Sequence, residues 1–240
     1  MPFAMPEHKL QILCTRPVDE SRIEEANQKD ILLDVLPFIE TEAIQTIEVQ
    51  QEIEWASVQE AVVVFTSMNA VEAVTEMLDG HIPEWRIFCM GFKTKELITT
   101  YFGAEAIAGT ADNADELANE IIEQEDPEEV IFFCGNQRRD ELPGKLEKHR
   151  ITVNEIVVYE TLAVEHSVEK EYDAVLFFSP SAVESFFKKN KLIARTIVFA
   201  IGNTTAKTVA KFCSNKVIIS KLPGKDELVT QALDYFSKNH

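Results

Sequence analysis

The sequence has little glycine and proline, with 8 and 9 residues respectively among 240. This scarcity excludes collagen-like and low-complexity chains, and a hydrophobic content of 45% is typical of a globular protein. Long apolar runs are also missing, because the longest are about five or six residues and a membrane helix needs roughly 20. The first residues lack a basic segment followed by an apolar core. We therefore expect no membrane span, no signal peptide and a cytoplasmic location.

Basic residues are scarce relative to acidic ones. Lys and Arg total 23 against 41 Asp and Glu, which gives a formal net charge of −18. Nucleic acid is excluded as an expected partner, because the phosphate backbone requires clustered Lys and Arg. If the ligand is an anion, its site must be locally positive within an unfavourable overall field.

Motifs for metals and cofactors are absent as well. The four cysteines (Cys14, Cys89, Cys134 and Cys213) form no CxxC pair, and the histidines are scattered. Three of these cysteines end apolar runs, which predicts core packing in a reducing compartment. The sequence contains neither G-x-G-x-x-G nor a P-loop. We therefore expect no metal and no cofactor.

An internal repeat is present. Residues 62–74 read VVVFTSMNAVEAV and residues 175–187 read VLFFSPSAVESFF, each an apolar run, a hydroxyl cluster and then Ala-Val-Glu. Other matches keep the same order: Cys14 aligns with Cys134 and Asp115 with Asp226, at offsets of 120 and 111 residues. A period near half the chain predicts two similar domains rather than a solenoid.

Strand-like and helix-like patterns alternate along both halves. Short apolar runs predict strands buried on both faces, at 10–14, 31–39, 61–66, 86–90, 104–108, 129–134, 151–159, 173–178, 196–201 and 216–219. One-sided apolar stripes predict helices that begin near 69 and 181 and helices at 115–122 and 226–236. This alternation predicts an α/β fold with two similar doubly wound parallel sheets. Two polar, alternating segments, 38–49 and 158–168, break the rhythm and predict extended connectors.

Six polar turns follow predicted strands. They are Thr15–Pro17, Thr66–Asn69, Gly91–Thr94, Gly135–Arg139, Ser179–Ser181 and Gly202–Thr205. Ligands of open α/β sheets bind beyond the carboxyl ends of the strands, and helix N-termini there attract anions. The same residue types are also the ordinary helix N-caps. Either interpretation fits a single turn, but the full set favours an anion site.

Cations and one phenol accompany these turns. The cations are Arg16, Lys93, Arg138, Arg139 and Lys207, which either hold an anion or are solvated surface charges. Tyr159 ends a predicted strand at a connector. It is either a core or hinge aromatic, or a phenol that faces the site and donates a proton.

The ordered set of motifs resembles the uroporphyrinogen-III synthase family. The matching segments are Thr15-Arg-Pro17, Phe65-Thr-Ser-x-Asn-Ala-Val71, Gly135-x-x-x-Arg-Asp-x-Leu142, Val158-Tyr159, Phe178-Ser-Pro-Ser-Ala-Val183 and Ile201-Gly-x-Thr-Thr-Ala206. They cover nearly the whole chain. The chain departs from the family at Cys134, where Arg is frequent, at Arg138, where Gly is frequent, and in the turn at Gly91.

The resemblance implies a domain layout. Residues 1–38 with 166–240 would form one discontinuous α/β domain, and 39–165 an inserted one, with connectors near 38–49 and 158–168. The N-terminal strands would be exchanged into the C-terminal domain.

The resemblance also implies an activity: cyclisation of hydroxymethylbilane to uroporphyrinogen III in haem biosynthesis, with inversion of ring D. The reaction would proceed by dehydration and a spiro intermediate and would need no cofactor. Tyr159 would be the proton donor. The residues expected to bind the substrate carboxylates are Thr15, Arg16, Thr66, Ser67, Asn69, Gly135, Asn136, Ser179, Ser181, Gly202, Thr204 and Thr205.

The expected partners are this tetrapyrrole substrate and hydroxymethylbilane synthase, which would hand it over; we expect a monomer. Two other classes stay open from the residues alone. A non-catalytic, two-lobed anion-binding protein would use the same turns, and a flavodoxin-like signalling protein would share the alternation of strands and helices.

Overall fold

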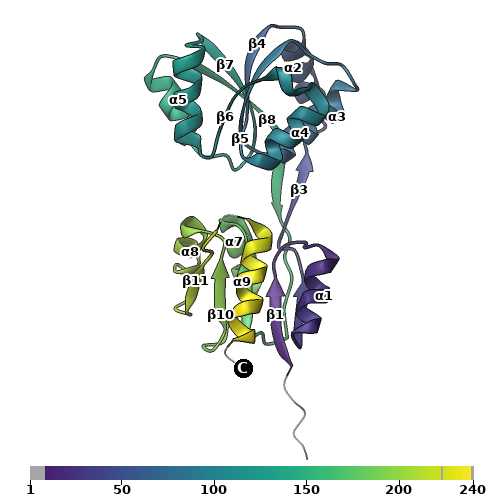
Figure 1. Cartoon of the computed structure of the whole chain (residues 1–240), viewed down its shortest axis with the longest axis vertical. Coiled ribbons are helices and arrows are strands. Elements are labelled where there is room, and N and C mark those ends of the chain that lie inside the picture. Colours follow the sequence, from purple (N-terminus) through teal and green to yellow (C-terminus); the bar gives the residue numbers. More distant parts are fainter. Residues whose placement is uncertain (1–8, 223, 239–240) are drawn as a thin grey trace, which may run out of the picture. The chain divides into compact units, whose positions relative to one another are not determined.

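The computed structural model describes residues 9–222 and 224–238 (Figure 1). The chain folds into two compact units. Unit 1 consists of Met1–Glu40 and Leu162–His240, and unit 2 of Thr41–Thr161. Each unit has a sheet with helices on both faces, as expected for an α/β fold.

Unit 1 is built on a five-stranded sheet with the order β11-β10-β9-β1-β2. The paired strands are parallel. The strands are β1 (Leu10–Cys14), β2 (Ile31–Val35), β9 (Ala174–Phe177), β10 (Ile197–Ala200) and β11 (Val217–Ile219). The helices are α1 (Glu20–Gln28), α7 (Pro180–Lys189), α8 (Asn203–Val209) and α9 (Lys225–Ser237).

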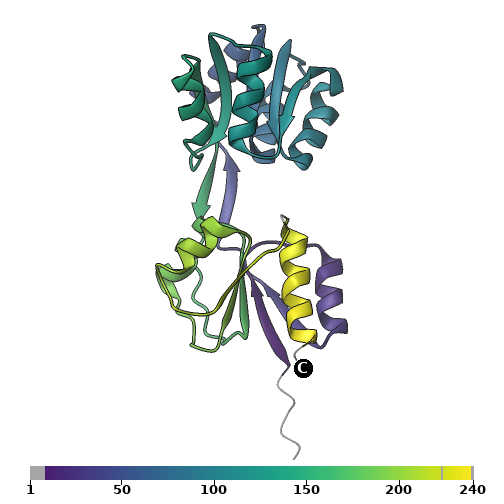
Figure 2. The ribbon, with the colours of Figure 1, turned by 60° about the vertical axis from the view of Figure 1, so that its left-hand side comes forward.

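Alternating residues of β1 supply the two cores of unit 1. Ile12 and Cys14 pack with α1 and α9, whereas Leu13 packs with α7 and α8. All three side chains are fully buried, which is why the strand reads as a continuous apolar run. Figure 2 shows α1 and α9 side by side on one face of the sheet.

Unit 2 is built on a six-stranded sheet with the order β3-β8-β7-β4-β5-β6. The strands are β3 (Ile39–Ala43), β4 (Ala61–Phe65), β5 (Trp85–Met90), β6 (Ile107–Ala111), β7 (Glu129–Gly135) and β8 (Thr152–Ala163). The helices are α2 (Ile47–Ser57), α3 (Met68–Leu78), α4 (Phe92–Phe102), η1 (Ala104–Ala106), α5 (Ala114–Gln124) and α6 (Glu141–Lys148). Helices α2, α3 and α4 cover one face, and α5 and α6 cover the other.

The internal repeat is reproduced in the strand order of the two sheets. The aligned segments place β1 with β7 and β9 with β4, and the match of Asp115 with Asp226 places β6 with β11, which leaves β5 to correspond to β10. With β2 matched to β8, both sheets then have the same order, because β2-β1-β9-β10-β11 corresponds to β8-β7-β4-β5-β6. The repeat therefore marks equivalent strands of two similar sheets.

The segments expected to be extended connectors are only partly extended. The segment 38–49 contains β3 but turns helical at Ile47, where α2 begins. The Thr46 hydroxyl caps this helix by accepting a hydrogen bond from Val49 N at 3.4 Å. The polar alternation of this segment predicts an extended connector, and the start of α2 corrects that prediction from Ile47 onward. The segment 158–168 continues β8 as far as Ala163.

β3 and β8 are hydrogen-bonded to each other. Ile44 N donates to Val158 O at 2.9 Å, and Val164 N donates to Phe38 O at 3.0 Å. The later residue of one strand thus pairs with the earlier residue of the other, so these two segments run antiparallel.

Two other strand predictions needed shifting. The run 31–39 is one strand only as far as Val35, since Pro37 lies within it and β3 begins at Ile39. The run 104–108 begins as a 3₁₀ turn, and its strand covers Ile107–Ala111.

Each sheet has one point at which the chain reverses its direction of travel across the sheet. In unit 1 it lies between β1 and β9, and in unit 2 between β7 and β4. Ligands of open α/β sheets bind at the carboxyl ends of the strands at such points. The turns that follow these four strands therefore define the candidate site in each unit.

Candidate active-site residues at the carboxyl ends of the strands

In unit 1, the turn after β9 forms the N-terminus of α7. Ser179 is the N-cap, and its Oγ accepts from Ala182 N at 3.1 Å and lies 3.1 Å from Ser181 Oγ. Both serines are half-buried. Proline occupies the first turn of α7, where its missing N–H is not needed. Two hydroxyls are thus held next to the positive end of a helix.

Thr15 does not have the role expected of it. Its side chain is fully buried, its hydroxyl donates to Leu176 O at 2.7 Å, and its backbone N–H donates to the same carbonyl at 3.2 Å. Thr15 therefore joins β1 to β9 instead of presenting a hydroxyl to a ligand. The neighbouring Arg16 is exposed.

Two cations of unit 1 lie at this edge, and a third, Lys207, lies in the last turn of α8. Arg16 and Lys225 both lie close enough to Cys14, the last residue of β1, to lower the pKa of its thiol, although burial dominates and raises that pKa to about 12. Within residues 9–222 and 224–238, none of the three forms a salt bridge. Their charges remain available to an anion, and sequence reasoning had missed Lys225.

The turn after β10 contributes less than expected. Gly202 precedes α8 and provides no side-chain cap, and Thr204 is exposed. Thr205 is buried, with 2% of its surface accessible. The Thr205 side chain therefore packs into the unit and does not face solvent at this edge.

In unit 2, the turn after β4 is the counterpart of the turn after β9. Ser67 is the N-cap of α3, and its Oγ accepts from Asn69 N at 3.2 Å. Thr66, Ser67 and Asn69 are half-buried, and Met68 is exposed. The repeated hydroxyl cluster of the sequence thus forms equivalent helix N-termini in the two units.

Tyr159 lies at the carboxyl end of β7 because β8 contains a register shift. The shift falls between Cys134 and Gly135, so Gly135 is opposite Tyr159. The phenol ring lies directly over the glycine, since a Cβ on Gly135 would be 2.4 Å from Tyr159 Cζ. The ring is half-buried. In the described part of the chain, the Tyr159 hydroxyl has no hydrogen-bond partner and can donate to a ligand.

Gly135 and Asn136 support this geometry more than they offer ligand contacts. Gly135 is buried and leaves room for the ring. Asn136 N donates to Tyr159 O at 3.1 Å, and Asn136 Oδ1 accepts from Thr161 N at 2.9 Å. The loop after β7 is therefore tied to β8 at Tyr159 and, two residues further on, at Thr161.

The two arginines after β7 differ in their partners. Arg138 pairs with Glu155 of β8 at 2.7 Å and with Asp140, and the hydrogen bond to Glu155 raises the pKa of its guanidinium. Its charge is compensated within unit 2, so Arg138 is not the anion-binding cation considered above. Arg139 is exposed and has no salt bridge within the described ranges.

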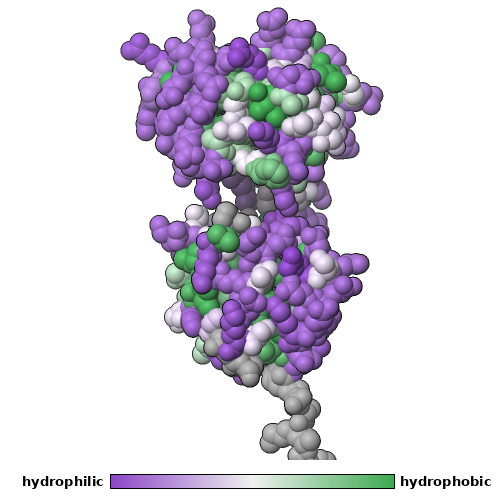
Figure 3. Space-filling model, in the orientation of Figure 1, coloured by the Kyte–Doolittle hydropathy of each residue, from purple (hydrophilic) through white to green (hydrophobic). Residues whose placement is uncertain are grey.

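The turn after β5 carries Lys93, which is among the candidate cations named above, and also Phe92 and Lys95, which sequence reasoning had not singled out. Gly91 has φ 87°, and Phe92, Lys93 and Lys95 begin α4. Phe92 is 75% exposed. Figure 3 shows apolar surface over the α4 side of unit 2, surrounded by hydrophilic surface. For Phe92 and Lys95, the signal in the sequence was their place in and next to the polar turn Gly91–Thr94.

Cysteines and other side chains that can bind metals are spread over both units in the described part of the chain. Within it, no group of three His, Cys, Asp or Glu side chains is placed to hold a metal. The thiols of Cys14, Cys89 and Cys134 are buried, and burial raises their pKa values to about 12, 11 and 12. No helix in residues 9–222 or 224–238 is long and apolar enough to cross a membrane.

One family model and several solved structures match most of the chain. A family model described as uroporphyrinogen-III synthase HemD matches residues 23–230. Among solved structures, the chain is similar to a mutant uroporphyrinogen III synthase of the extremely thermophilic bacterium Thermus thermophilus, with a TM-score of 0.67, 14% identity, and coverage of 96% of this chain and 100% of that one. It is also similar to uroporphyrinogen-III synthetase of Helicobacter pylori, with a TM-score of 0.66, 16% identity, and coverage of 94% and 99%. No curated protein sequence matched significantly.

The fold and its edges thus define an α/β protein that presents hydroxyls, cations and one phenol at the carboxyl ends of two similar sheets. Because the family model covers most of the chain, the chain belongs to the uroporphyrinogen-III synthase family. It is an enzyme of tetrapyrrole biosynthesis.

Proposed function

We propose that the protein is a cyclising hydro-lyase that converts hydroxymethylbilane to uroporphyrinogen III and inverts ring D. The observation that carries the proposal is the repeated chemistry of the two sheets. Each presents a serine N-cap and cations without carboxylate partners at its carboxyl edge within the described residues, although the chain has a net charge of −18. A linear tetrapyrrole with many carboxylates suits such edges.

The first chemical step is loss of the substrate hydroxyl as water, which requires a proton. The Tyr159 phenol supports this step, because its hydroxyl has no partner within the described residues and lies at the edge near the β7–β4 switch point. The phenol donates its proton to the departing oxygen as the C–O bond breaks, and solvent restores the proton afterwards.

The later steps use the substrate's own pyrroles. The electrophilic carbon left by dehydration is attacked by the substituted carbon of ring D, and the resulting spiro intermediate fragments and closes again with that ring inverted. No protein nucleophile is required. Holding the reacting atoms together can lower a barrier by about 7–11 kcal/mol in favourable cases, whereas one acid contributes about 10²–10⁴-fold. Confinement of the substrate is therefore the main source of the rate and of the choice of isomer.

Several side chains would hold the substrate carboxylates. In unit 1 these are Arg16, Ser179, Ser181 and Lys225, and in unit 2 Thr66, Ser67 and Asn69. Helix N–H groups and hydroxyls donate to carboxylate oxygens, and the cations lower the cost of bringing many negative charges together. Gly202 and Thr204 would contribute backbone or hydroxyl contacts of lesser weight.

We also propose that the enzyme works as a cytoplasmic monomer and receives its unstable substrate from hydroxymethylbilane synthase. Light scattering of the protein alone measures its oligomeric state, and a stable homodimer would contradict the monomer. The handover is measured by the rate of conversion in the presence of the synthase. If the rate is the same with added free hydroxymethylbilane as with hydroxymethylbilane made by the synthase in the same reaction, the handover is contradicted.

The function is tested by a coupled assay. Hydroxymethylbilane is generated in situ, the protein is added, and the oxidised products are separated by chromatography. Spontaneous closure gives the uninverted isomer I, so an excess of isomer III is the expected result. Isomer I alone, from protein shown to be folded by circular dichroism, would overturn the proposal.

A further inference from the structure

An exposed aromatic side chain stands at the edge of unit 2 beside an exposed methionine. Phe92 is the first residue of α4 and Met68 the first residue of α3, and they are 75% and 37% exposed. Each follows the turn after a parallel strand, β5 and β4 respectively, and these strands are neighbours in the sheet. The two side chains line the same hollow.

This hollow has the size and the charge of a small-molecule subsite. Its volume is about 690 Å³, within the range of about 300–1,000 Å³ typical of ligand pockets. Besides Phe92 and Met68, it is lined by Lys93, Lys95 and one carboxylate, Glu96. Neither lysine forms a salt bridge within the described ranges of the chain.

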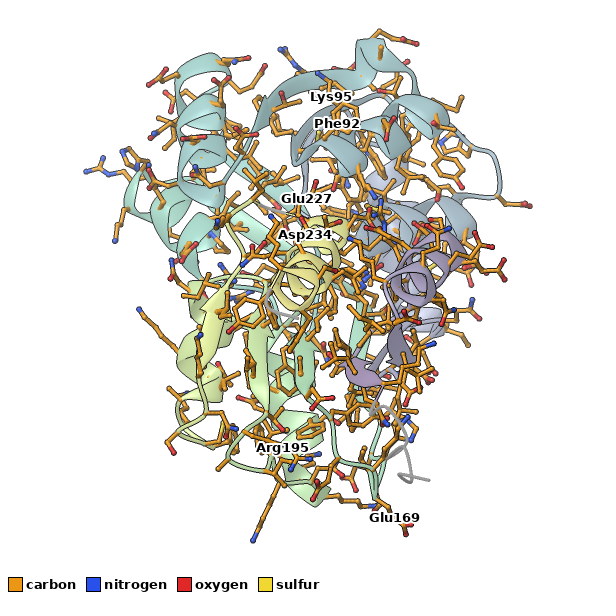
Figure 4. All side chains as sticks on the ribbon, turned by 60° about the horizontal axis from the view of Figure 1, so that its bottom comes forward. Phe92, Lys95, Glu169, Arg195, Glu227 and Asp234 are labelled. Atoms are coloured by element: carbon orange, nitrogen blue, oxygen red, sulfur yellow. The ribbon has the colours of Figure 1, made fainter. Side chains whose placement is uncertain are left out.

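A second hollow lies on the other side of Phe92 and has the opposite charge. It measures about 450 Å³, shares Phe92 and Lys95 with the first, and is lined by Asp112, Glu116 and Glu120. Figure 4 shows Phe92 and Lys95 at the same end of α4, as expected for residues three apart on a helix. A carboxylated ligand is therefore repelled from the second hollow and attracted to the first.

Folding gives no reason for an aromatic residue at position 92. A single exposed apolar residue is ordinary on a protein surface. Phe92 differs because it adjoins an exposed methionine and, within the described residues, two lysines without carboxylate partners at the edge where the ligand is expected. Tyr101, on the same helix, is 48% exposed and lines neither hollow.

We propose that Phe92, with Met68, Lys93 and Lys95, forms a subsite for one acid-bearing pyrrole ring of the substrate. This inference rests on the proposed function and names a binding element that the family motifs do not include. The pyrrole packs against the phenyl face and the methionine thioether, and the two lysines pair with its carboxylates. Phe92 fixes the position of one ring and takes no part in proton transfer.

The test compares Phe92→Ala with Tyr101→Ala, which removes another exposed aromatic side chain from the far end of the same helix. An aromatic contact of ordinary strength predicts a KM for hydroxymethylbilane about threefold to tenfold higher in Phe92→Ala, with kcat within about twofold of wild type. Phe92→Leu should lie between the two, because it keeps the apolar area but not the ring. Tyr101→Ala should match wild type.

Substitution of the two lysines provides a second test of the subsite. Lys93→Gln combined with Lys95→Gln should raise KM and weaken its dependence on salt, since charge pairing is screened by ions. Equal KM values for Phe92→Ala and Tyr101→Ala, with both proteins folded, would overturn the subsite.

Failure of the subsite and failure of the function can be told apart. If wild-type protein makes isomer III and Phe92→Ala has the same KM as wild type, the proposed function stands and the subsite is rejected. If wild type makes only isomer I, titration with uroporphyrin I, followed by fluorescence, tests the subsite directly. Weaker binding by Phe92→Ala than by Tyr101→Ala then supports a tetrapyrrole subsite without the catalytic function, and equal binding rejects it.

Discussion

The ring of Tyr159 occupies the space that a side chain at position 135 would need. A Cβ on Gly135 would lie 2.4 Å from Tyr159 Cζ and 2.8 Å from its hydroxyl oxygen, far inside van der Waals contact. Gly135 is not among the glycines with positive φ. A glycine is thus needed at position 135 because the tyrosine ring fills the space next to it, and not because the backbone has a positive φ. Gly135 and Tyr159 therefore depend on each other at the end of β7.

Gly135→Ala should therefore displace the phenol. We expect kcat to fall by more than about tenfold with a smaller change in KM, because a proton donor moved by an ångström loses its alignment. Overpacking should also lower the free energy of unfolding by about 1–3 kcal/mol. Steady-state isomer assays and urea denaturation measure the two effects.

Gly144→Ala is the matched control for this substitution. Gly144 lies inside α6, and a Cβ there meets nothing within 4 Å. The change should stabilise the protein by about 0.5–1 kcal/mol, because alanine is the better helix former, and should leave kcat unaltered. Wild-type kcat in Gly135→Ala would contradict the pairing of Gly135 with a catalytic tyrosine.

Tyr159→Phe tests the proton donor without disturbing the ring packing. Confinement supplies more of the rate than any one acid, so turnover should fall by about 10²- to 10⁴-fold but not vanish. The ratio of isomer III to isomer I should stay high, because the fold of the site is retained. Complete loss of isomer III from a folded variant would refute the view that confinement dominates. An unchanged kcat would refute the role of the phenol.

Thr15→Val addresses the residue whose expected role the structure corrected. The variant keeps the shape but removes the donor to Leu176 O, so the free energy of unfolding should fall by about 1–3 kcal/mol. KM should not change, because the hydroxyl is buried. Thr15→Ser should recover most of the stability. A raised KM with unaltered stability in Thr15→Val would return Thr15 to the substrate-binding set.

The sequence predicted the strand and helix alternation well, because buried parallel strands produce unmistakable apolar runs. The repeat was informative for the same reason: the two hydroxyl clusters at Ser67 and Ser179 had to form equivalent N-caps. What the pattern obscured was α2, because the alternation of Glu with Ile and Val after Thr46 resembles a strand. The cap on Val49 N and the burial of Ile53 and Ala56 in the core favour the helix instead.

The candidate site was less predictable than the fold. Motif letters could not show that Thr15 points inward, because the residues after a strand divide between core and surface according to the sheet's twist and register. Nor could they show the register shift that places Tyr159 over Gly135. The carboxylate partners of Arg138 are Glu155 of β8 and Asp140 at the start of α6. Such contacts between elements have no local signal in the sequence.

An ion cluster joins α1 to α9 within unit 1 and gives the last prediction. Lys29 Nζ lies 3.0 Å from Glu25 Oε1 and 2.9 Å from Asp234 Oδ1, and Asp234 is labelled on α9 in Figure 4. The hydrogen bond from Lys29 holds the pKa of each carboxylate below its ordinary value, 4.5 for Glu25 and 3.8 for Asp234. The bond to Asp234, followed by that to Glu25, raises the pKa of Lys29.

The direction of the pH effect follows from these shifts. Carboxylates with lowered pKa values stabilise the fold above their ordinary pKa, and this stabilisation is lost as the pH falls through the lowered values. The raised pKa of Lys29 adds stability that is lost only as the pH rises above its ordinary value of 10.5. Because the side chains are 27–46% exposed, solvent screening limits the whole cluster to about 0.5–1 kcal/mol.

Lys29→Gln should therefore lower the free energy of unfolding by about 0.5–1 kcal/mol at pH 7, and the difference from wild type should shrink towards zero below about pH 3. Urea denaturation at both pH values measures it. Lys211→Gln is the control, since Lys211 is exposed and forms no salt bridge within the described ranges of the chain. A difference that persists unchanged at pH 3 would mean that Lys29 acts through the packing of its alkyl chain between α1 and α9, and not through its charge.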